Sequence, residues 1–291
     1  MLIQLVINSL VAGVIYALLA FGFTITYGTL NFFNMAHGMA YTLGAYFSYV
    51  LRIQWGLSLP LAFGLSTVAT AVAMTGVDRI AYAHLRTRAA PSWALVVSSI
   101  GVAIFLEALI SLLFGSDTLS LRVGEAAPGY TVLGAIITPT QISILVVSTI
   151  LMIALTFYLR MTLMGKALRA TANDVEMARV VGIDPESTYR STFALASGLA
   201  AIAGSLVALE TDLFPTMGHT ALLKSIVASI IGGIGSVPGA VVGALFLGCA
   251  ENFGVWKLSS SWRDGIALAL LMLFLLVRQT LARAGQESRG R

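Results

Sequence analysis

Long apolar stretches recur along almost the whole chain, and short polar segments separate them. A helix needs ~20 apolar residues, within a range of ~17–25, to cross a bilayer. The stretches predict helical spans near residues 5–27, 35–51, 58–77, 93–114, 141–159, 191–209, 221–233, 237–253 and 264–278. The pattern therefore predicts an all-α, polytopic transmembrane bundle of about eight or nine spans, with residues 1–291 forming a single membrane domain.

Two of these spans carry signals for a break in the helix. The stretch at 221–233 is too short for a full crossing and ends in "GGIGSVPG", whose glycines and proline interrupt a helix. A second break is expected at "YGTLNFFN", before the span at 35–51. A membrane tolerates a half-helix only where protein shields its free backbone groups. The bundle is therefore expected to contain interrupted helices.

Composition points to the same class of protein. The chain is 58% hydrophobic and 10% charged, with a mean hydropathy of +0.91, whereas soluble domains carry about 25% charged residues. The N-terminal "MLIQLVINSL" lacks the basic region of a signal peptide. The net charge is +4, but the basic residues lie in the connections between spans, where membrane topology explains them. We therefore expect no nucleic-acid partner. Cys249 is the single cysteine, and His37, His84 and His219 are scattered, so no internal disulfide and no metal site are expected.

Lysine and arginine gather in three clusters, and such clusters favour the cytoplasmic side of a membrane. The clusters are Arg79, Arg86 and Arg88; Arg160, Lys166, Arg169, Arg179 and Arg190; and Arg278, Arg283, Arg289 and Arg291. All three fall in the cytoplasm if the N-terminus lies outside, the spans alternate and the C-terminus is cytoplasmic. The loop at about 115–140, which holds Arg122 against Asp117 and Glu125, is then extracytoplasmic.

The most polar segment, at about 160–190, falls in the cytoplasm under this topology. Within it, "TANDVEMARVVGI" spaces Val175, Ala178 and Val181 as one apolar helix face. Asn173 or Asp174 would cap this helix and Gly182 would end it. Such a short amphipathic helix lies on lipid, docks on a soluble partner or packs under its own bundle, and the pattern leaves these three uses open.

Three motifs connect the chain to a known family. They are "NMAHG" at 34–38, "GKALRATANDVEMARVVGI" at 165–183 and "KSIVASIIGGIGSVPGAVVGALFLGCAE" at 224–251. In this order and at these separations they resemble the permease subunits of bacterial ATP-binding-cassette importers, in the branched-chain amino acid (LivH-like) family, over nearly the whole chain. Met35 stands where the family usually has Phe, and Met39 stands where many members have Glu. If that acidic residue shapes the substrate path, a different ligand is preferred here.

The resemblance implies that the cytoplasmic helix fits a groove on a separate ATPase. The residues implied in this coupling are Gly165, Ala170, Asp174, Glu176, Ala178 and Gly182. It also implies a second homologous permease subunit, two cytoplasmic ATPase subunits and an extracytoplasmic substrate-binding protein, assembled in the lipid of a bacterial inner membrane. The chain has no G-x-x-x-x-G-K-[ST] motif, because Ala167 follows Gly165-Lys166. ATP is therefore expected on partner subunits, with no cofactor and no enzymatic activity on this chain.

The cargo implied by the resemblance is a branched-chain or other hydrophobic amino acid. Urea, short amides and aromatic acids remain alternatives, because importers of this type select cargo largely through the binding protein. From another class, a secondary transporter or channel that works without an ATPase also remains open. A membrane enzyme is disfavoured, since the sequence offers no nucleophile–base or metal constellation.

Polar residues inside apolar spans are costly, and several of them, together with the glycines at the helix breaks, are candidates for the translocation path or its gate. The candidates are Asn34, His37, Gly38, Lys224, Gly232, Gly233, Gly235 and Glu251.

Four of the candidates form two pairs, and each pair has two competing roles. Asn34 and His37 are expected on one helix face near the cytoplasmic start of the second span, where they either line the path or bond backbone groups opened by the break. Lys224 and Glu251 are expected near the outer ends of their spans, where they could pair as a structural clamp or belong to the path. Glu107 lies mid-span, and its surroundings are left open.

Overall fold

Helices form most of the chain in the computed structural model, which describes residues 2–122, 129–132, 134–257 and 259–289. Glu125 and Arg291 lie outside these residues. The helices are α1 (Leu2–Leu30), α2 (His37–Tyr49), α3 (Leu59–Val77), α4 (Ala83–Thr87), α5 (Ser92–Phe114), α6 (Pro139–Met161), α7 (Leu163–Asn173), α8 (Val175–Val180), α9 (Pro185–Glu210), α10 (Met217–Gly232), α11 (Val237–Val255) and α12 (Arg263–Arg289). Short π-helical turns follow α2 (Val50–Gln54) and join α3 to α4 (Asp78–Tyr82), and a 3-10 turn (Ser260–Trp262) precedes α12.

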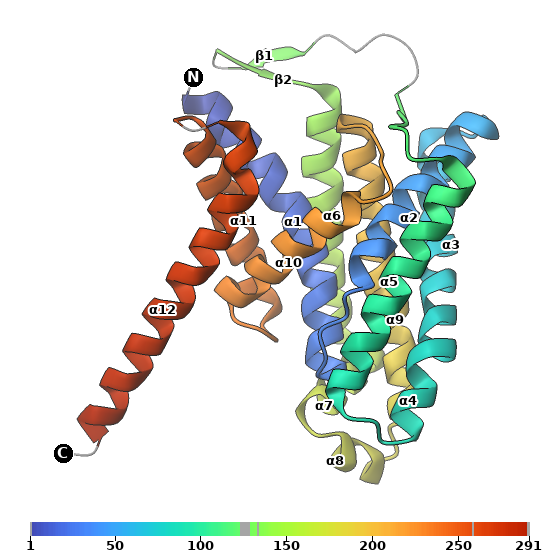
Figure 1. The fold of residues 1–291 in the computed structure, drawn as a ribbon, viewed down its shortest axis with the longest axis vertical. Coiled ribbons are helices and arrows are strands. Elements are labelled where there is room, and N and C mark those ends of the chain that lie inside the picture. The colour runs from blue at the N-terminus through green and yellow to red at the C-terminus, as the bar shows by residue number, and fades with distance from the viewer. Residues whose placement is uncertain (1, 123–128, 133, 258, 290–291) are drawn as a thin grey trace.

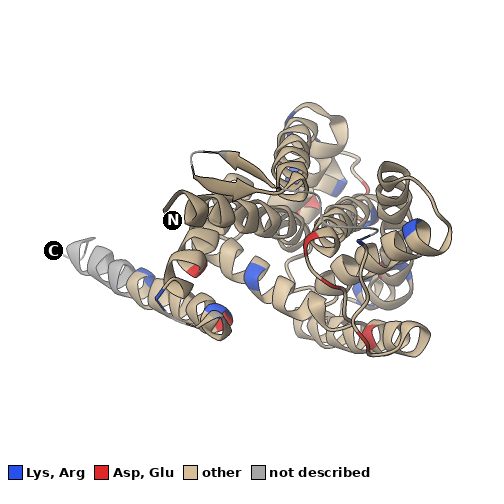
Figure 2. Cartoon of the chain, turned by 90° about the horizontal axis from the view of Figure 1, so that it is seen from above, with Lys and Arg blue, Asp and Glu red and all other residues tan. Residues whose placement is uncertain are grey.

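Length and apolarity identify the membrane-crossing helices. Within the described residues, six helices are long and apolar enough to cross a bilayer: Leu2–Leu30, Leu59–Thr87, Ser92–Phe114, Pro139–Met161, Pro185–Glu210 and Val237–Val255. Large apolar side chains on their outer faces are exposed, as they are at Leu112 and Ile150. Figure 2 shows that most of the helical surface carries no charged residue. The chain is therefore a helical membrane protein.

The two ends of the bundle differ. Figure 1 shows the N-terminus beside a small hairpin at one end, and α7 and α8 at the opposite end. The hairpin pairs β1 (Tyr130–Val132) with β2 (Ala135–Ile137) in antiparallel register. Gln4 of α1 secures it, because Ile136 N–H donates to Gln4 Oε1 at 2.8 Å and Gln4 Nε2 donates to the Ile136 carbonyl at 3.1 Å. The all-α prediction missed this hairpin, since three-residue strands leave almost no periodic signal.

Small residues hold the centre of the bundle together. A Cβ added at Gly44 of α2 would run into the backbone of Ala201 on α9, and one at Gly204 would run into the backbone of Tyr41. Beside this contact, Ser48 Oγ lies 2.8 Å from Ser66 Oγ and 2.7 Å from Ser205 Oγ. Close approach of small residues with hydroxyl bridges is the usual way in which membrane helices associate.

The third span is longer than predicted. The sequence suggested an end near residue 77, but the helix continues through the π turn and α4 to Thr87. Asp78, at the π turn, is fully buried. The polar residues 78–87, which the pattern assigned to a cytoplasmic loop, therefore extend the helix that begins at Leu59.

Candidate functional site

The connection between α1 and α2 folds back into the bundle. Segment 31–36 returns from the end of α1, and α2 begins only at His37. His37 Nε2 donates to the carbonyl of Leu19, in the middle of α1, at 3.2 Å. α2 thus starts at mid-depth, and the expected position near the cytoplasmic start of a span is wrong.

Asn34 lies in this connection, so the predicted helix face shared with His37 is also wrong. Its side-chain oxygen accepts hydrogen bonds from Ala36 N–H at 3.1 Å and from the Tyr82 hydroxyl at 3.4 Å. Ser99 Oγ accepts from Met35 N–H at 3.0 Å. These bonds satisfy backbone groups that a buried non-helical segment would otherwise leave free. Asn34 and His37 support the break, and a role in the path stays a prediction.

The predicted break after residue 232 is present. α10 ends at Gly232, and Gly233 and Gly235 adopt φ values of +92° and +88°, which favour glycine. Ser236 Oγ then accepts from Gly239 N–H at 3.2 Å and caps α11. Gly235 also lines a cavity of about 280 Å³ together with Arg160 and Arg169, next to α7. The break therefore adjoins the polar segment.

The short helices α2 and α10 cross each other at their first turns. A Cβ at Gly38 of α2 would collide with the carbonyl of Gly218 on α10, and a Cβ at Gly218 would collide with the carbonyl of Gly38. Gly38 is thus a point of backbone contact, as its motif suggested for close helix approach.

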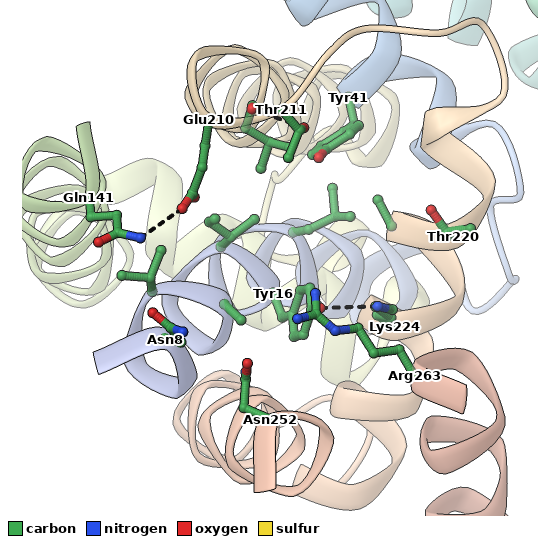
Figure 3. Close-up of a pocket in the computed structure, with 16 residues that line it drawn as sticks. Asn8, Tyr16, Tyr41, Gln141, Glu210, Thr211, Thr220, Lys224, Asn252 and Arg263 are labelled. Atoms are coloured by element: carbon green, nitrogen blue, oxygen red, sulfur yellow. Dashed lines mark hydrogen bonds between the residues drawn. The ribbon is translucent and has the colours of Figure 1, made fainter. Parts of the chain in front are cut away.

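Beyond the crossing, towards the hairpin end, lies a cavity of about 360 Å³ (Figure 3). Its polar lining side chains come from the start of α1, from α2, α6, α9, α10 and α11, and from the start of α12. They are Asn8, Tyr16, Tyr41, Gln141, Glu210, Thr211, Thr220, Lys224, Asn252 and Arg263. Apolar residues such as Val11, Ile15 and Val207 complete the wall. The cavity can therefore solvate a small molecule that has both polar and apolar parts.

Lys224 stands at one wall of this cavity and is almost fully buried. Its Nζ lies 3.2 Å from Glu251 Oε2, 3.4 Å from Asp264 Oδ1 and 3.1 Å from the Tyr16 hydroxyl. The Tyr16 hydroxyl donates to the same Glu251 oxygen at 2.8 Å. The predicted contact between Lys224 and Glu251 is thus present. Among the described residues the second Glu251 oxygen, Oε1, is buried without a hydrogen-bond partner.

At the mouth of the cavity, Glu210 accepts a hydrogen bond from Gln141 Nε2 at 3.0 Å. Figure 3 shows this pair on the wall away from Lys224 and Arg263, with Asn252 and Tyr41 pointing into the space between the walls. Charges of both signs therefore border the cavity.

Glu107 has a partner that sequence reasoning missed. Its Oε2 lies 2.6 Å from Nε2 of His219, near the start of α10. The two residues are 112 positions apart, so no local pattern links them. The side chains remain 27% and 47% exposed, respectively, at the surface of the bundle.

The polar segment forms α7 and α8 at the end opposite the hairpin. Asp174 caps α8, because its Oδ1 accepts from Glu176 N–H at 2.9 Å and from Met177 N–H at 3.0 Å. Gly182 ends the turn with a φ of +87°. The predicted cap and stop are therefore confirmed.

The remaining predicted coupling residues lie in the same segment. The carbonyl of Ala170 accepts the hydrogen bond that Asp174 N–H donates at 3.0 Å, while Gly165 packs against the backbone of Leu159.

The apolar face predicted for α8 is partly wrong. Ala178 is buried, but Val181 is exposed, as are Met177 and Val180. In the six-residue helix Ala178 is buried and Val175 is half-buried, while Met177 and Val180 point away from the bundle. Packing under its own bundle therefore accounts for Val175 and Ala178 only.

Next to this segment lies a buried ion cluster that the sequence did not reveal. The Arg86 guanidinium donates to Asp78 Oδ1 at 2.7 Å and Oδ2 at 3.2 Å, and to Glu186 Oε1 at 3.1 Å and Oε2 at 2.9 Å. It also lies 4.9 Å from the ring centre of Tyr189. The cluster ties α4 and the end of α3 to the first turn of α9, directly after α8. Arg86 had been assigned only to a basic loop.

Within the described part of the chain, no group of three or more His, Cys, Asp or Glu side chains could hold a metal ion. The polar groups gathered in the structure can bind, orient or move a solute through hydrogen bonds and charge.

Comparisons with known proteins agree with these features. The chain is 35% identical over 295 residues to the high-affinity branched-chain amino acid transport system permease protein BraD of Pseudomonas aeruginosa, covering 96% of this chain and 94% of that protein. It is 35% identical to the permease protein LivH of Escherichia coli, with the same coverage. The solved structure of PsaBC from Streptococcus pneumoniae in complex with Fab matches the fold with a TM-score of 0.51 at 11% identity, over 92% of this chain and 89% of that one.

A family match extends over nearly the same part of the chain. Residues 5–276 match the family described as the branched-chain amino acid transport system permease component. Because this match and the two curated relatives span almost all of the sequence, the chain belongs to the family of branched-chain amino acid transport system permease components.

Proposed function

We propose that this chain is the permease subunit of an ATP-binding-cassette importer in the bacterial inner membrane, and that it carries branched-chain or other hydrophobic amino acids. Its curated relatives are named as high-affinity branched-chain amino acid permeases. A cavity bordered by charges and lined by Val11, Ile15 and Val207 suits solutes with a zwitterionic head and an apolar side chain.

The observation that carries the proposal is the exposed apolar surface of α8. Val180 is 79% exposed at the end of the bundle opposite the hairpin. A short capped helix with uncovered Met177, Val180 and Val181 fits insertion into a groove on a soluble protein. We propose that this protein is a cytoplasmic ATPase subunit, one of two, and that it supplies the ATP site that the sequence motifs of this chain do not.

We further propose a topology of eight or nine spans, with the N-terminus and the hairpin outside and the C-terminus inside. The distribution of basic residues supports this orientation, since Lys166, Arg169 and Arg179 lie on α7 and α8. In this proposal residues 1–291 form one permease domain, which pairs with a second homologous permease and receives cargo from an extracytoplasmic binding protein. ATP-driven movement at α8 then opens and closes the path.

Reconstitution tests the proposal. The chain is placed in proteoliposomes with a candidate second permease, ATPase and binding protein from the same organism, and uptake of labelled leucine, phenylalanine, benzoate, acetamide and urea is measured with and without ATP on the ATPase side. We expect uptake of leucine that requires both ATP and the binding protein. Uptake that follows an ion gradient and ignores ATP would instead identify a secondary transporter, and uptake of urea or acetamide alone would reassign the cargo.

A further inference from the structure

The Glu107–His219 pair occupies an unusual position for charged side chains in a membrane protein. Glu107 lies seven residues before the end of α5, which corresponds to a depth of about 10 Å along the helix. The hydrocarbon core extends about 15 Å from its centre to either edge. Both side chains nevertheless reach the surface of the bundle.

Lipid is a poor environment for this pair. Ionisable groups in membrane segments normally face the interior of a bundle or a water-filled cavity, because hydrocarbon cannot replace their hydration. A hydrogen bond of 2.6 Å satisfies one carboxylate oxygen and one ring nitrogen, while the other polar atoms of both groups still need partners. The surface around the pair must therefore be covered by protein or by water that protein encloses.

The surroundings of the pair form a continuous face. Figure 1 shows α10 crossing in front of α1 and α6, with α5 beside it on the same side of the molecule. Ile104 and Ile100 lie three and seven residues before Glu107, so they share its side of α5, and both are exposed, as is Phe214 just before α10. We call these three residues with Glu107 and His219 the α5–α10 face. An aromatic and apolar border around a small polar centre is typical of a protein interface.

We propose that the α5–α10 face is the contact surface for the second permease subunit, and that the Glu107–His219 pair meets polar groups of that subunit across the interface. The inference rests on the proposed function, which requires two permeases around one path. A two-fold arrangement would bring the same face of both subunits together, so the pair would border the path that runs between them.

Site-specific photo-crosslinking in the assembled importer tests this surface. A benzoylphenylalanine is introduced at Ile100 or Ile104, and the matched control positions are Val72 on α3 and Ile150 on α6, which are also exposed apolar residues. After irradiation we expect an adduct with the second permease from Ile100 and Ile104 and none from the controls. An adduct of twice the chain mass or one with a homologue would both support the proposal.

A second variant probes the polar centre. Replacing both Glu107 and His219 by leucine suits a lipid-facing surface, so it would leave assembly unchanged if lipid covers this face. If the second permease covers it, we expect a severalfold loss of co-purified permease while the melting temperature of the isolated chain is unchanged.

The result that would overturn the inference is specific to it. Complexes that take up leucine in response to ATP, yet give no adduct from Ile100 and Ile104 or give adducts from the controls instead, would assign the interface elsewhere and leave the proposed function intact. Failure of uptake in the unmodified complex would instead count against the function itself.

Discussion

Lys224 and Glu251 form an ion pair in which neither residue is expected to tolerate the loss of the other. Both are buried, and Glu251 Oε2 accepts from Lys224 Nζ and from Tyr16. Removing one partner of a buried pair typically costs about 3–5 kcal/mol, because the other charge is left without compensation. Lys224→Glu is therefore expected to lower the melting temperature of the detergent-solubilised protein and to reduce uptake.

The reciprocal change separates the two roles that the sequence left open. Combining Lys224→Glu with Glu251→Lys should restore most of the stability if the pair holds the wall of the cavity together. Recovery of uptake together with stability indicates a structural clamp, whereas recovery of stability alone indicates that the lysine itself serves the path. Asp264 also lies 3.4 Å from Lys224 Nζ, so both variants are made with Asp264→Asn, and in that background a double variant as unstable as the single one contradicts the pairing.

Glycine positions give a second prediction at this scale. Gly44→Ala adds a Cβ that collides with Ala201, and Gly204→Ala adds one that collides with Tyr41. Both are expected to lower the melting temperature, because α2 and α9 must separate. Gly64→Ala on α3 is the control, since nothing lies within 4 Å of its added Cβ, and alanine favours a helix over glycine by about 1 kcal/mol. Equal effects at Gly44 and Gly64 would refute the packing argument.

Some residue contacts were accessible from the sequence and others were not. Lys224 and Glu251 fall near ends of successive spans, so counting spans places them on one side. His219 and Glu107 lie on helices that only the full fold brings together. Arg86 looked like a loop residue because Glu186, one of its two carboxylate partners, lies 100 positions further along the chain, where no local period links the two.

At the scale of elements, α8 ends in a turn that only a flexible residue allows. Gly182 has a φ of +87°, whereas proline is fixed near −65°. Gly182→Pro is therefore expected to reorient α8 and to abolish co-purification of the ATPase, with little change in the amount of folded permease. Lys166→Gln, on exposed α7, is the control and should retain the ATPase. Full ATPase binding and uptake in Gly182→Pro would argue against α8 as the coupling element.

The Arg86 cluster predicts a mechanical link between elements. Arg86 joins α4 and the end of α3 to the first turn of α9, four residues after Gly182. Arg86→Lys keeps a positive charge but loses the planar fork that bridges two carboxylates. We expect the complex to assemble and hydrolyse ATP while more ATP is consumed for each leucine imported. A variant with an unchanged ratio of ATP hydrolysed to leucine imported would show that the cluster only stabilises the fold.

Element type was easier to predict than element extent. Apolar length identified the membrane helices, and cap residues identified both ends of α8. The return of segment 31–36 into the bundle was not predictable, because Met35 N–H bonds to Ser99 and the Asn34 side chain bonds to Tyr82, both from distant parts of the chain. The extension of α3 to Thr87 depends on Asp78, whose burial is possible only beside Arg86.

At the scale of the whole molecule, the proposed topology predicts opposite accessibility for the two ends of the bundle. Cys249→Ser removes the single cysteine, after which Val180→Cys or Tyr130→Cys introduces one at an exposed site. A membrane-impermeant maleimide should label Tyr130→Cys in right-side-out vesicles and Val180→Cys in inverted vesicles. Labelling of Val180→Cys from outside would reverse the orientation and remove α8 from the ATPase.

The hydropathy of the whole chain predicted the fold class better than the short motifs did. Mean hydropathy and helix length were sufficient for a helical membrane protein, but half-helices made the number of crossings ambiguous: α10 has 16 residues and is apolar without reaching across. The hairpin contacts Gln4 and α10 crosses α2 at Gly38, and both contacts join residues too far apart for one window along the sequence to contain them.

The crossing of α2 and α10 determines how wide the large cavity is. Tyr41 lies three residues beyond Gly38, and Lys224 lies six residues beyond Gly218. These two lining side chains therefore belong to the two helices whose spacing is fixed at the crossing. The backbones of the two glycines meet there, with Thr42 and Leu222 beside them, and a side chain inserted at Gly38 would force the helices apart. Gly38 does not itself line the cavity, so we expect Gly38→Ala, a single added methyl group, to change the size of the molecule that the cavity admits.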